Sequence, residues 1–303
     1  MKVEQEGMTL LEFQKRFATE EACRDHLFRL RWPDGYRCPR CGHGQYYFHR
    51  TRRLYECKAC RYQVSLTAGT VFHDTRTPLM KWFWMIFLMA RPKSGISMLS
   101  LQRMLAIRSY KTVWTMGHKI RKAMADRDAH YKLGGLVEMD DSFFGARKPG
   151  NRGRGASGKE PVIVSVENRG KKAGFAKMRR VDKVDARNIR SIADDGFGDG
   201  TVMRTDGLHA YWTLKGWRGT HEQVIVGTGK KASILLPWVH TLLANLKGNI
   251  RGVYRGVSGK HLQRYLDEFC YRFNRRFWEA QLFDRILTAC ACTSTITFSE
   301  LKA

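Results

Sequence analysis

The sequence has 303 residues, of which 43% are hydrophobic and 12% are aromatic. This composition predicts a folded protein with room for more than one compact unit, and it excludes an intrinsically disordered chain. The 54 Lys and Arg residues outnumber the 28 Asp and Glu residues, which gives a formal net charge of +26. Because the basic residues run through the whole length, we expect a polyanionic partner, and nucleic acid is the usual one.

The sequence gives no sign of export or of membrane insertion. Residues Met1 to Gly7 are polar, unlike the start of a secretory signal peptide. The longest apolar run, Trp82 to Ala90, is far shorter than the roughly 20 residues of a membrane span. We therefore expect an intracellular, cytoplasmic protein that does not contact a membrane. Four cysteines are typical of free thiols in such a reducing compartment: Cys23, Cys270, Cys290 and Cys292.

The first 70 residues predict a helix, from about Thr9 to Arg31, followed by a zinc ribbon. Two Cys-x-x-Cys pairs are separated by 15 residues: Cys38 and Cys41, then Cys57 and Cys60. This spacing is typical of two loops that hold four thiolates around one structural Zn²⁺ ion. Strand-like residues at 45–54 and 62–66 complete the ribbon pattern. We expect the ribbon to present three basic side chains to DNA: Arg40, Lys58 and Arg61.

Residues 71–130 predict a helical module. One helix starts at Pro78 and ends before Pro92, a second covers 97–106, and a third covers 109–125. The tight turn between the last two helices indicates a helix-turn-helix, in which the third predicted helix, 109–125, faces DNA. A basic helical linker is the alternative explanation. The basic residues that we expect to meet DNA on the third helix are Lys111, Lys119, Arg121 and Lys122.

Beyond residue 131 the pattern changes to strands, and we expect one catalytic domain over 131–303 that ends in C-terminal helices. The predicted strands cover residues 136–144, 161–168, 174–181, 201–205 and 223–226, and the predicted helices cover 185–194, 236–250 and 260–277. This order indicates an α/β domain with a mixed sheet flanked by helices. It fits an RNase H-like fold.

Asp140 and Asp206 each follow a run of strand-like residues. In the first run, period-two alternation puts Glu138 and Asp140 on the face opposite Val137 and Met139. Two carboxylates on neighbouring strands can hold a pair of divalent ions, about 3.5–4 Å apart, as phosphoryl transfer requires. Either aspartate alone is also explained as a turn cap, so the assignment depends on the pair.

His240 and Lys247 lie on the helix predicted over 236–250. They are separated by nearly two helical turns, so their side chains share one helix face. We expect His240 to complete the metal site with the two aspartates. We expect Lys247 to hold a DNA phosphate beside the ions.

Together these features resemble the insertion-sequence transposases that join an N-terminal zinc ribbon to a DDE-type, RNase H-like catalytic domain. The resemblance covers nearly the whole chain, and it is carried by the ribbon cysteines and by the runs Val137–Gly145, Arg204–Tyr211, Leu246–Gly252 and Val257–Arg276. It implies that Asp140 and Asp206 are the first two catalytic acids and that two Mg²⁺ or Mn²⁺ ions are bound. It also implies hydrolysis and strand transfer on double-stranded DNA, by a homo-oligomer that holds the element ends. Three further basic residues are expected to face DNA: Arg251, Arg275 and Arg276.

The sequence departs from the family pattern at position 240, where the third acid is replaced by histidine. A neutral imidazole is a softer ligand than a carboxylate and adds no negative charge, so it favours Mn²⁺ over Mg²⁺. Asn245 and Glu268 are the other candidates for this ligand. Asn245 lies about 140° around the helix from His240, and Glu268 is also explained as a surface acid.

Two other functions are compatible with these features. The histidine at position 240 would suit a non-catalytic zinc-ribbon DNA-binding regulator derived from a transposase. A nuclease or RNA-processing enzyme of the same fold would cleave without joining.

Overall fold

The computed structural model describes residues 7–145, 158–224 and 235–302. The chain divides into two compact units: unit 1 is Met1–Pro92, Met98–Asp126 and Trp278–Ala303, and unit 2 is Lys93–Ser97 and Arg127–Phe277. This division differs from the predicted segments 1–70, 71–130 and 131–303, because the last helices of the chain belong to unit 1. Among the described helices, none combines the length and the hydropathy that crossing a membrane requires.

Unit 1 begins with two helices where the sequence predicted one. Helix α1 (Leu10–Arg16) is capped by Thr9, and α2 (Glu20–Arg31) is capped by Thr19. The Thr19 hydroxyl accepts a hydrogen bond from the Ala22 N–H at 3.1 Å. A threonine in this role has an extended backbone and starts a new helix, which explains why the predicted helix is interrupted.

The core of unit 1 is an aromatic cluster formed by helices from both ends of the chain. Helix α3 (Leu79–Ala90) contributes Phe83 and Phe87, and α10 (Leu282–Cys292) contributes Phe283. The Phe13 ring of α1 lies 4.2 Å from that of Phe87 and 5.3 Å from that of Phe283, measured between centroids. Aromatic burial of this kind dominates the stability of small cores. The C-terminal helix α10 is therefore a structural part of unit 1.

Helices α4 (Met98–Met104) and α5 (Tyr110–Ala129) confirm the predicted helical pair. Gly117 lies in the middle of α5, and a Cβ atom at this position would collide with the Met98 sulfur. The glycine therefore allows α4 to approach α5 closely. A short C-terminal helix, α11 (Phe298–Lys302), contacts the start of α5, because the Lys111 ammonium lies 4.0 Å from the centroid of the Phe298 ring.

The ribbon in unit 1 is a three-stranded antiparallel sheet of β1 (Tyr46–His49), β2 (Leu54–Cys57) and β3 (Gln63–Ser65). One side of this sheet packs against α2. The Tyr55 ring lies 5.4 Å from the rings of both Phe28 and Trp32. Strands of three and four residues bury little apolar surface, so the ribbon depends on these aromatic contacts and on its cysteines.

Unit 2 contains a five-stranded sheet in the order β6-β5-β4-β7-β8. Its strands are β4 (Leu136–Phe144), β5 (Glu160–Asn168), β6 (Ala173–Arg180), β7 (Val202–Thr205) and β8 (Thr220–Gln223). Strands β4, β5 and β6 are antiparallel neighbours, whereas β7 and β8 are parallel to β4. This mixed sheet confirms the predicted RNase H-like domain. The last strand is Thr220–Gln223 rather than 223–226, and residues 225 and 226 lie outside the described residues.

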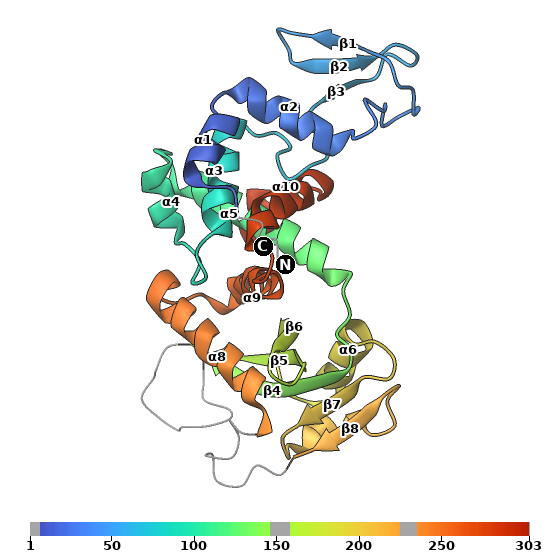
Figure 1. Cartoon of the computed structure of the whole chain (residues 1–303), viewed down its shortest axis with the longest axis vertical. Helices are drawn as coiled ribbons and strands as arrows, with labels where there is room; N and C mark the ends of the chain where they lie inside the picture. Colours follow the sequence, from blue (N-terminus) through green and yellow to red (C-terminus); the bar gives the residue numbers. More distant parts are fainter. Residues whose placement is uncertain (1–6, 146–157, 225–234, 303) are drawn as a thin grey trace, which may run out of the picture. The chain divides into compact units, whose positions relative to one another are not determined.

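Helices cover both faces of the sheet (Figure 1). On one face, α8 (Pro237–Asn249) and α9 (Gly259–Asn274) pack on Val162, Val164 and Val166 of β5. On the other face, α6 (Ala186–Gly196) and the 3-10 helix η1 (His209–Leu214) pack on Val137, Met139 and Met203. Two single-turn elements, η2 (Ile250–Tyr254) and η3 (Glu279–Gln281), complete the described helices.

The outer edge of β6 is covered by two side chains of α9, Gln263 in its first half and Asn274 at its end. The Asn274 amide accepts from the Ala176 N–H at 2.7 Å and donates to the Ala176 carbonyl at 3.1 Å. Gln263 accepts from the Arg180 N–H at 2.7 Å and donates to the Met178 carbonyl at 2.9 Å. These amides substitute for the strand that would otherwise pair with this edge.

Candidate functional site

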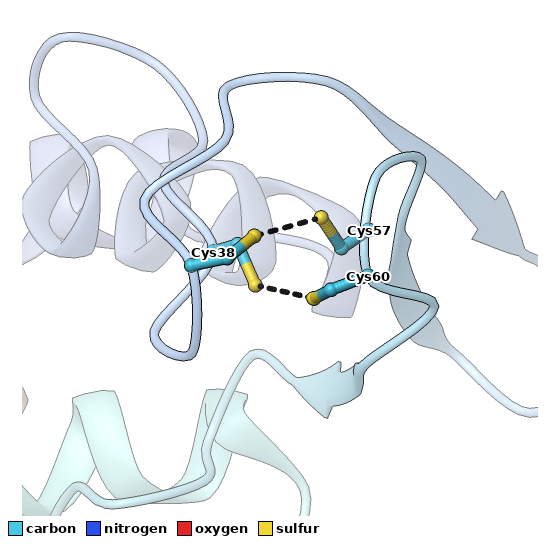
Figure 2. Close-up of side chains that lie close together, drawn as sticks. Cys38, Cys57 and Cys60 are labelled. Carbon is cyan, nitrogen blue, oxygen red and sulfur yellow. Dashed lines mark hydrogen bonds between the residues drawn. The ribbon is translucent and has the colours of Figure 1, made fainter.

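The four ribbon cysteines converge on one point. Their sulfur atoms all lie within 4.8 Å of one another, with 3.6 Å between the sulfurs of Cys38 and Cys60 and 3.5 Å between those of Cys41 and Cys57. Tetrahedral Zn²⁺ with bonds of about 2.3 Å requires sulfur separations of about 3.8 Å. Figure 2 shows the thiols of Cys38, Cys57 and Cys60 pointing toward one another. The donor set and its spacing therefore fit the predicted structural zinc.

Two similar backbone turns hold the cysteine pairs. The Gly42 N–H donates to the Cys38 carbonyl at 2.9 Å, and the Arg61 N–H donates to the Cys57 carbonyl at 3.1 Å. Gly42 has φ +75° and Arg61 has φ +58°. Each turn therefore ends with a residue in the left-handed region, which favours glycine. The arginine at 61 therefore has a backbone cost that the glycine at 42 avoids.

The side of the ribbon that carries Tyr47 is exposed and rich in hydrogen-bond donors. The Lys58 ammonium lies 5.0 Å from the centroid of the Tyr47 ring, which is 52% exposed. Glu56 lies at the centre of this side and accepts hydrogen bonds from Gln63, His49 and Arg61 at 2.7–3.1 Å. These bonds lower the pKa of Glu56 to about 2. The Glu56 carboxylate is thus surrounded by donors.

Asp140 lies on β4, and Asp206 directly follows β7, the parallel neighbour of β4 in unit 2. The last pair between β4 and β7 joins Met139 to Thr205. The next residue of each segment is an aspartate, so Asp206 lies beside Asp140 in this parallel register. Asp140 is the fifth of the nine residues of β4 rather than a strand end, because β5 continues to pair with it through Val164. Along β7, Met203 packs into the core on the α6 side; alternation gives Asp206 the same face as Asp140.

Each aspartate is oriented by a nearby backbone N–H group. Asp140 Oδ1 accepts from the Asp141 N–H at 2.8 Å, and Asp206 Oδ1 accepts from the Leu208 N–H at 3.1 Å. The face that carries them is the one covered by α8, because Val164 opposite Asp140 belongs to the same core cluster as Val239 of α8. The predicted alternation that separates Glu138 and Asp140 from Val137 and Met139 is therefore present.

His240 and Lys247 lie on α8 and interact electrostatically. Burial lowers the pKa of His240, and the Lys247 ammonium lowers it further, so the imidazole is neutral at neutral pH. The His240 Nε2 atom is buried and has no hydrogen-bond partner among the described residues. Desolvation lowers the pKa of Lys247, and the Asp140 carboxylate acts in the opposite direction. A neutral imidazole nitrogen of this kind is suited to bind a metal ion.

The three predicted ligands do not form a tight cluster. Within the described ranges, the four cysteines are the only group of three or more His, Cys, Asp or Glu side chains that lie close enough together to hold a metal ion. Of the alternative ligands, Asn245 is exposed on α8. Glu268 is 1% exposed, accepts from the Tyr254 hydroxyl at 3.1 Å and pairs with Arg272 at 3.5 Å. Glu268 is therefore committed to contacts within unit 2.

Glu138 is a residue whose role the sequence analysis missed. It is fully buried, and its carboxylate accepts from the N–H groups of Trp238 and Val239 at 2.9 and 3.0 Å and from the Asn168 amide at 2.7 Å. Burial raises its pKa, although these donors act in the opposite direction. The available signal was the start of α8 at Pro237, because the residue directly before it is Leu236, whose side chain cannot cap a helix.

Several residues predicted to contact DNA are buried or make contacts within the protein. Arg121 is fully buried in α5, so the predicted contact between this side chain and DNA is wrong for this structure. The Arg276 guanidinium donates to the carbonyls of Ala173, Gly174 and Phe273. Lys119 is half-buried and burial lowers its pKa, and Lys122 pairs with Asp126 at 2.5 Å. The predicted DNA-contacting residues that remain exposed are Arg40, Lys58, Arg61, Lys111 and Arg251.

Arg275 is also a structural residue, which corrects its predicted role at DNA. Its side chain is 7% exposed, pairs with Asp128 at 2.6 Å, and stacks 3.6 Å from the centroid of the Tyr271 ring. The sequence placed this arginine in a basic run at a helix end. It did not reveal that a carboxylate far earlier in the chain neutralises it.

We expect Arg275→Ala to lower the free energy of unfolding by about 3–5 kcal/mol, because Asp128 is left nearly buried without its partner. Urea unfolding measures this change. Arg251→Ala removes an exposed arginine from the same unit and is expected to alter the unfolding free energy by less than about 0.5 kcal/mol. If Arg275→Ala leaves stability intact but reduces the salt dependence of DNA binding, the structural assignment fails.

Comparison with known proteins agrees with this organisation. A model of the ISXO2-like transposase domain matches residues 132–274, and a model of the transposase zinc-ribbon domain matches residues 18–63. An uncharacterized protein in transposable element ISH50 of Halobacterium salinarum is 28% identical over 281 residues, which cover 85% of this chain and 92% of that protein.

Two solved structures are more distantly similar. A pre-cleavage Mos1 transpososome has a TM-score of 0.29 and 12% identity, over 67% of this chain and 76% of that one. A Mos1 transposase paired-end complex with the left transposon end has a TM-score of 0.26 and 13% identity, over 65% and 75%. At these TM-scores the likeness carries no argument about the fold, which is described by the strand order alone.

The two family models together match more than half of the chain, and the protein belongs to the insertion-sequence transposases that combine a transposase zinc ribbon with an ISXO2-like transposase domain.

Proposed function

We propose that the protein binds the ends of an insertion sequence and catalyses metal-dependent cleavage and strand transfer into target DNA. The observation that carries this proposal is the register of β4 and β7, which brings Asp140 and Asp206 to one face of the sheet beside α8. A regulator that only binds DNA would not need two adjacent carboxylates on the face that also carries His240.

In this proposal, Asp140, Asp206 and His240 hold the divalent ions. The Nε2 atom of His240, which has no hydrogen-bond partner in the described part of the chain, and the two carboxylates are donors that Mn²⁺ or Mg²⁺ accepts. Bound divalent ions supply charge neutralisation at the scissile phosphate. Lys247 is exposed on the same helix and binds a neighbouring phosphate as a point charge.

The reaction comprises two phosphoryl transfers. Hydrolysis breaks the P–O3′ bond at the element end and leaves a 3′-hydroxyl. That hydroxyl then attacks a target phosphodiester, so a new P–O3′ bond forms as the target P–O3′ bond breaks. No covalent intermediate with the protein is involved. Joining two ends requires more than one copy of the chain, and we expect a homo-oligomer on paired ends.

The ribbon is proposed as one DNA-contacting surface. Its exposed Tyr47, Phe48 and Tyr62 are 39–52% exposed and lie among exposed basic residues. Basic groups bind phosphates, and their contribution falls with salt because counterions are released on binding. Lys111 and Arg251 are the exposed candidates outside the ribbon.

The experiment that tests the function is an assay of the purified full chain on duplex DNA that carries the element's terminal repeats, with Mg²⁺ or Mn²⁺ and a supercoiled target. Joined products support the proposal. Cleaved ends without joining would assign a nuclease. End binding without cleavage in either metal would assign a regulator, and preference for an RNA duplex would indicate an RNA-processing enzyme.

We expect His240→Ala to reduce cleavage in both metals and His240→Glu to shift the preference from Mn²⁺ toward Mg²⁺. A carboxylate is a harder ligand than imidazole and adds a negative charge. The measurement is the ratio of cleavage rates in the two metals. Asn245→Ala, an exposed change on the same helix, is the control and is expected to leave the ratio unchanged. Full activity of His240→Ala would assign the third ligand to another residue.

A further inference from the structure

Helix α8 begins without a local cap. Its N-cap residue is Leu236, which provides no side-chain hydrogen bond, and its first residue is Pro237, which has no N–H group. The first donors that need acceptors are therefore the N–H groups of Trp238 and Val239. Helices usually satisfy these donors with a Ser, Thr, Asp or Asn side chain at the N-cap.

Glu138 satisfies both donors from a position 100 residues earlier in the chain. One carboxylate oxygen, Oε2, accepts from Trp238 and Val239, and the other, Oε1, accepts from the Asn168 amide. The side chain is fully buried, and a carboxylate at this end of a helix also interacts favourably with the helix dipole. All three of these neighbours donate, so both carboxylate oxygens of Glu138 must act as acceptors.

The Glu138 carboxylate joins β4 and α8, the two elements that carry the candidate ligands Asp140 and His240. Glu138 precedes Asp140 by two residues on the same face of β4, which is about 7 Å along a strand. Val239 directly precedes His240, at about 1.5 Å of helix rise per residue. The Glu138 carboxylate therefore fixes the backbone next to His240 against the strand that carries Asp140.

We propose that Glu138 is a positioning residue that fixes His240 relative to Asp140. This inference rests on the proposed metal site. A displacement of about 1 Å at a reacting centre can reduce a rate by about 10²-fold, and outer contacts of metal ligands commonly contribute about 10–100-fold in affinity. Glutamine does not substitute for Glu138, because its NH₂ group faces a donor in either orientation.

The matched control is Glu167, another buried glutamate in the sheet. Its carboxylate accepts from the N–H of Phe175 at 3.0 Å, from the N–H of Gly134 at 3.2 Å and from Arg169 at 2.6 Å, and none of these partners is in α8. Glu167→Gln therefore removes a comparable buried carboxylate while the start of α8 stays anchored. Asn168→Ala is a milder variant, which removes one of the three donors to Glu138.

The test is Mn²⁺ binding to the zinc-loaded full chain, measured by electron paramagnetic resonance, with thermal unfolding in parallel. We expect Glu138→Gln to weaken Mn²⁺ binding by about 10–100-fold, Asn168→Ala to weaken it less, and Glu167→Gln to leave it within about twofold. In the His240→Ala background, Glu138→Gln is expected to add no further loss, because residues acting through one group are not additive. Equal weakening by Glu167→Gln, or additive losses in the double variant, would overturn the inference.

A second readout separates this inference from the proposed function. The imidazole NMR signal of His240, assigned by its absence in His240→Ala, is expected to shift or broaden in metal-free Glu138→Gln and to stay unchanged in Glu167→Gln. An unchanged His240 signal in Glu138→Gln overturns the positioning role. Failure of the unmodified chain to bind Mn²⁺ would instead overturn the proposed metal site, and the NMR result would still decide the role of Glu138.

Discussion

Replacing Asp140 or Asp206 with asparagine is expected to reduce cleavage and joining of element ends on the order of 10³-fold or more. Each substitution removes a negative charge from the candidate site and leaves the side-chain volume almost unchanged. Affinity for the element ends is expected to remain within about twofold, because these residues lie in unit 2 and the proposed ribbon surface lies in unit 1. Single-turnover cleavage and a binding titration at fixed salt measure the two effects.

Asp141→Asn is the matched control for these substitutions. Asp141 follows Asp140 on β4 and pairs with Ile163 of β5, whose side chain belongs to the core cluster on the α6 side. Alternation therefore gives Asp141 the opposite face of the sheet from Asp140. If Asp141→Asn abolishes cleavage while Asp140→Asn retains it, the face assigned to the catalytic carboxylates is wrong.

Removal of the ribbon metal is expected to unfold the ribbon and to abolish high-affinity end binding. Structural zinc contributes about 10–16 kcal/mol of apparent free energy in small zinc domains. The strands of this ribbon have only three or four residues each, so little else stabilises them. Cys57→Ser is expected to have the same effect, because Cys57 is fully buried and a hydroxyl is a poor replacement for a thiolate ligand. Zinc content and trypsin cleavage at Arg52 and Arg53 measure the outcome.

Cys292→Ser controls for the loss of a thiol, since Cys292 is exposed and lies at the end of α10, outside the ribbon. It is expected to retain one zinc per chain and the protease resistance of the ribbon. A zinc-free Cys57→Ser variant that still binds ends with full affinity would contradict the structural role of the metal. Unit 2 has its own core, and its unfolding transition is expected to persist without zinc.

The parts of the fold that the sequence predicted are those with local signals. The cysteine spacing identified the ribbon, and alternation located β4 and the face of Asp140. The predicted helix from Thr9 to Arg31 missed the break at Thr19, because a threonine that caps a second helix looks like an ordinary residue within a longer amphipathic pattern. The last helices were assigned to the catalytic segment because nothing local reveals that Phe283 packs against Phe13.

The parts of the site that the sequence missed depend on pairs of residues far apart in the chain. Arg275 and Arg121 have the same local signature as arginines that contact DNA, and only the fold shows that they are buried. Glu138 lies only two residues before the proposed catalytic Asp140, yet it accepts hydrogen bonds from two backbone N–H groups about 100 residues later in the chain. Burial and long-range capping are properties of the folded structure, so composition and periodicity carry little information about them.

The covered edge of β6 has a consequence for synthesis of the chain. Asn274, which pairs with Ala176, is made 98 residues after it, so roughly 5–20 s pass at about 5–20 residues per second before the amide exists. During that interval the nascent β6 has an open row of N–H and carbonyl groups that can pair with another growing chain. A ribosome that stalls before residue 263 would therefore release an aggregation-prone sheet, and truncations just before and just after α9 are expected to differ sharply in their yield of dispersed protein.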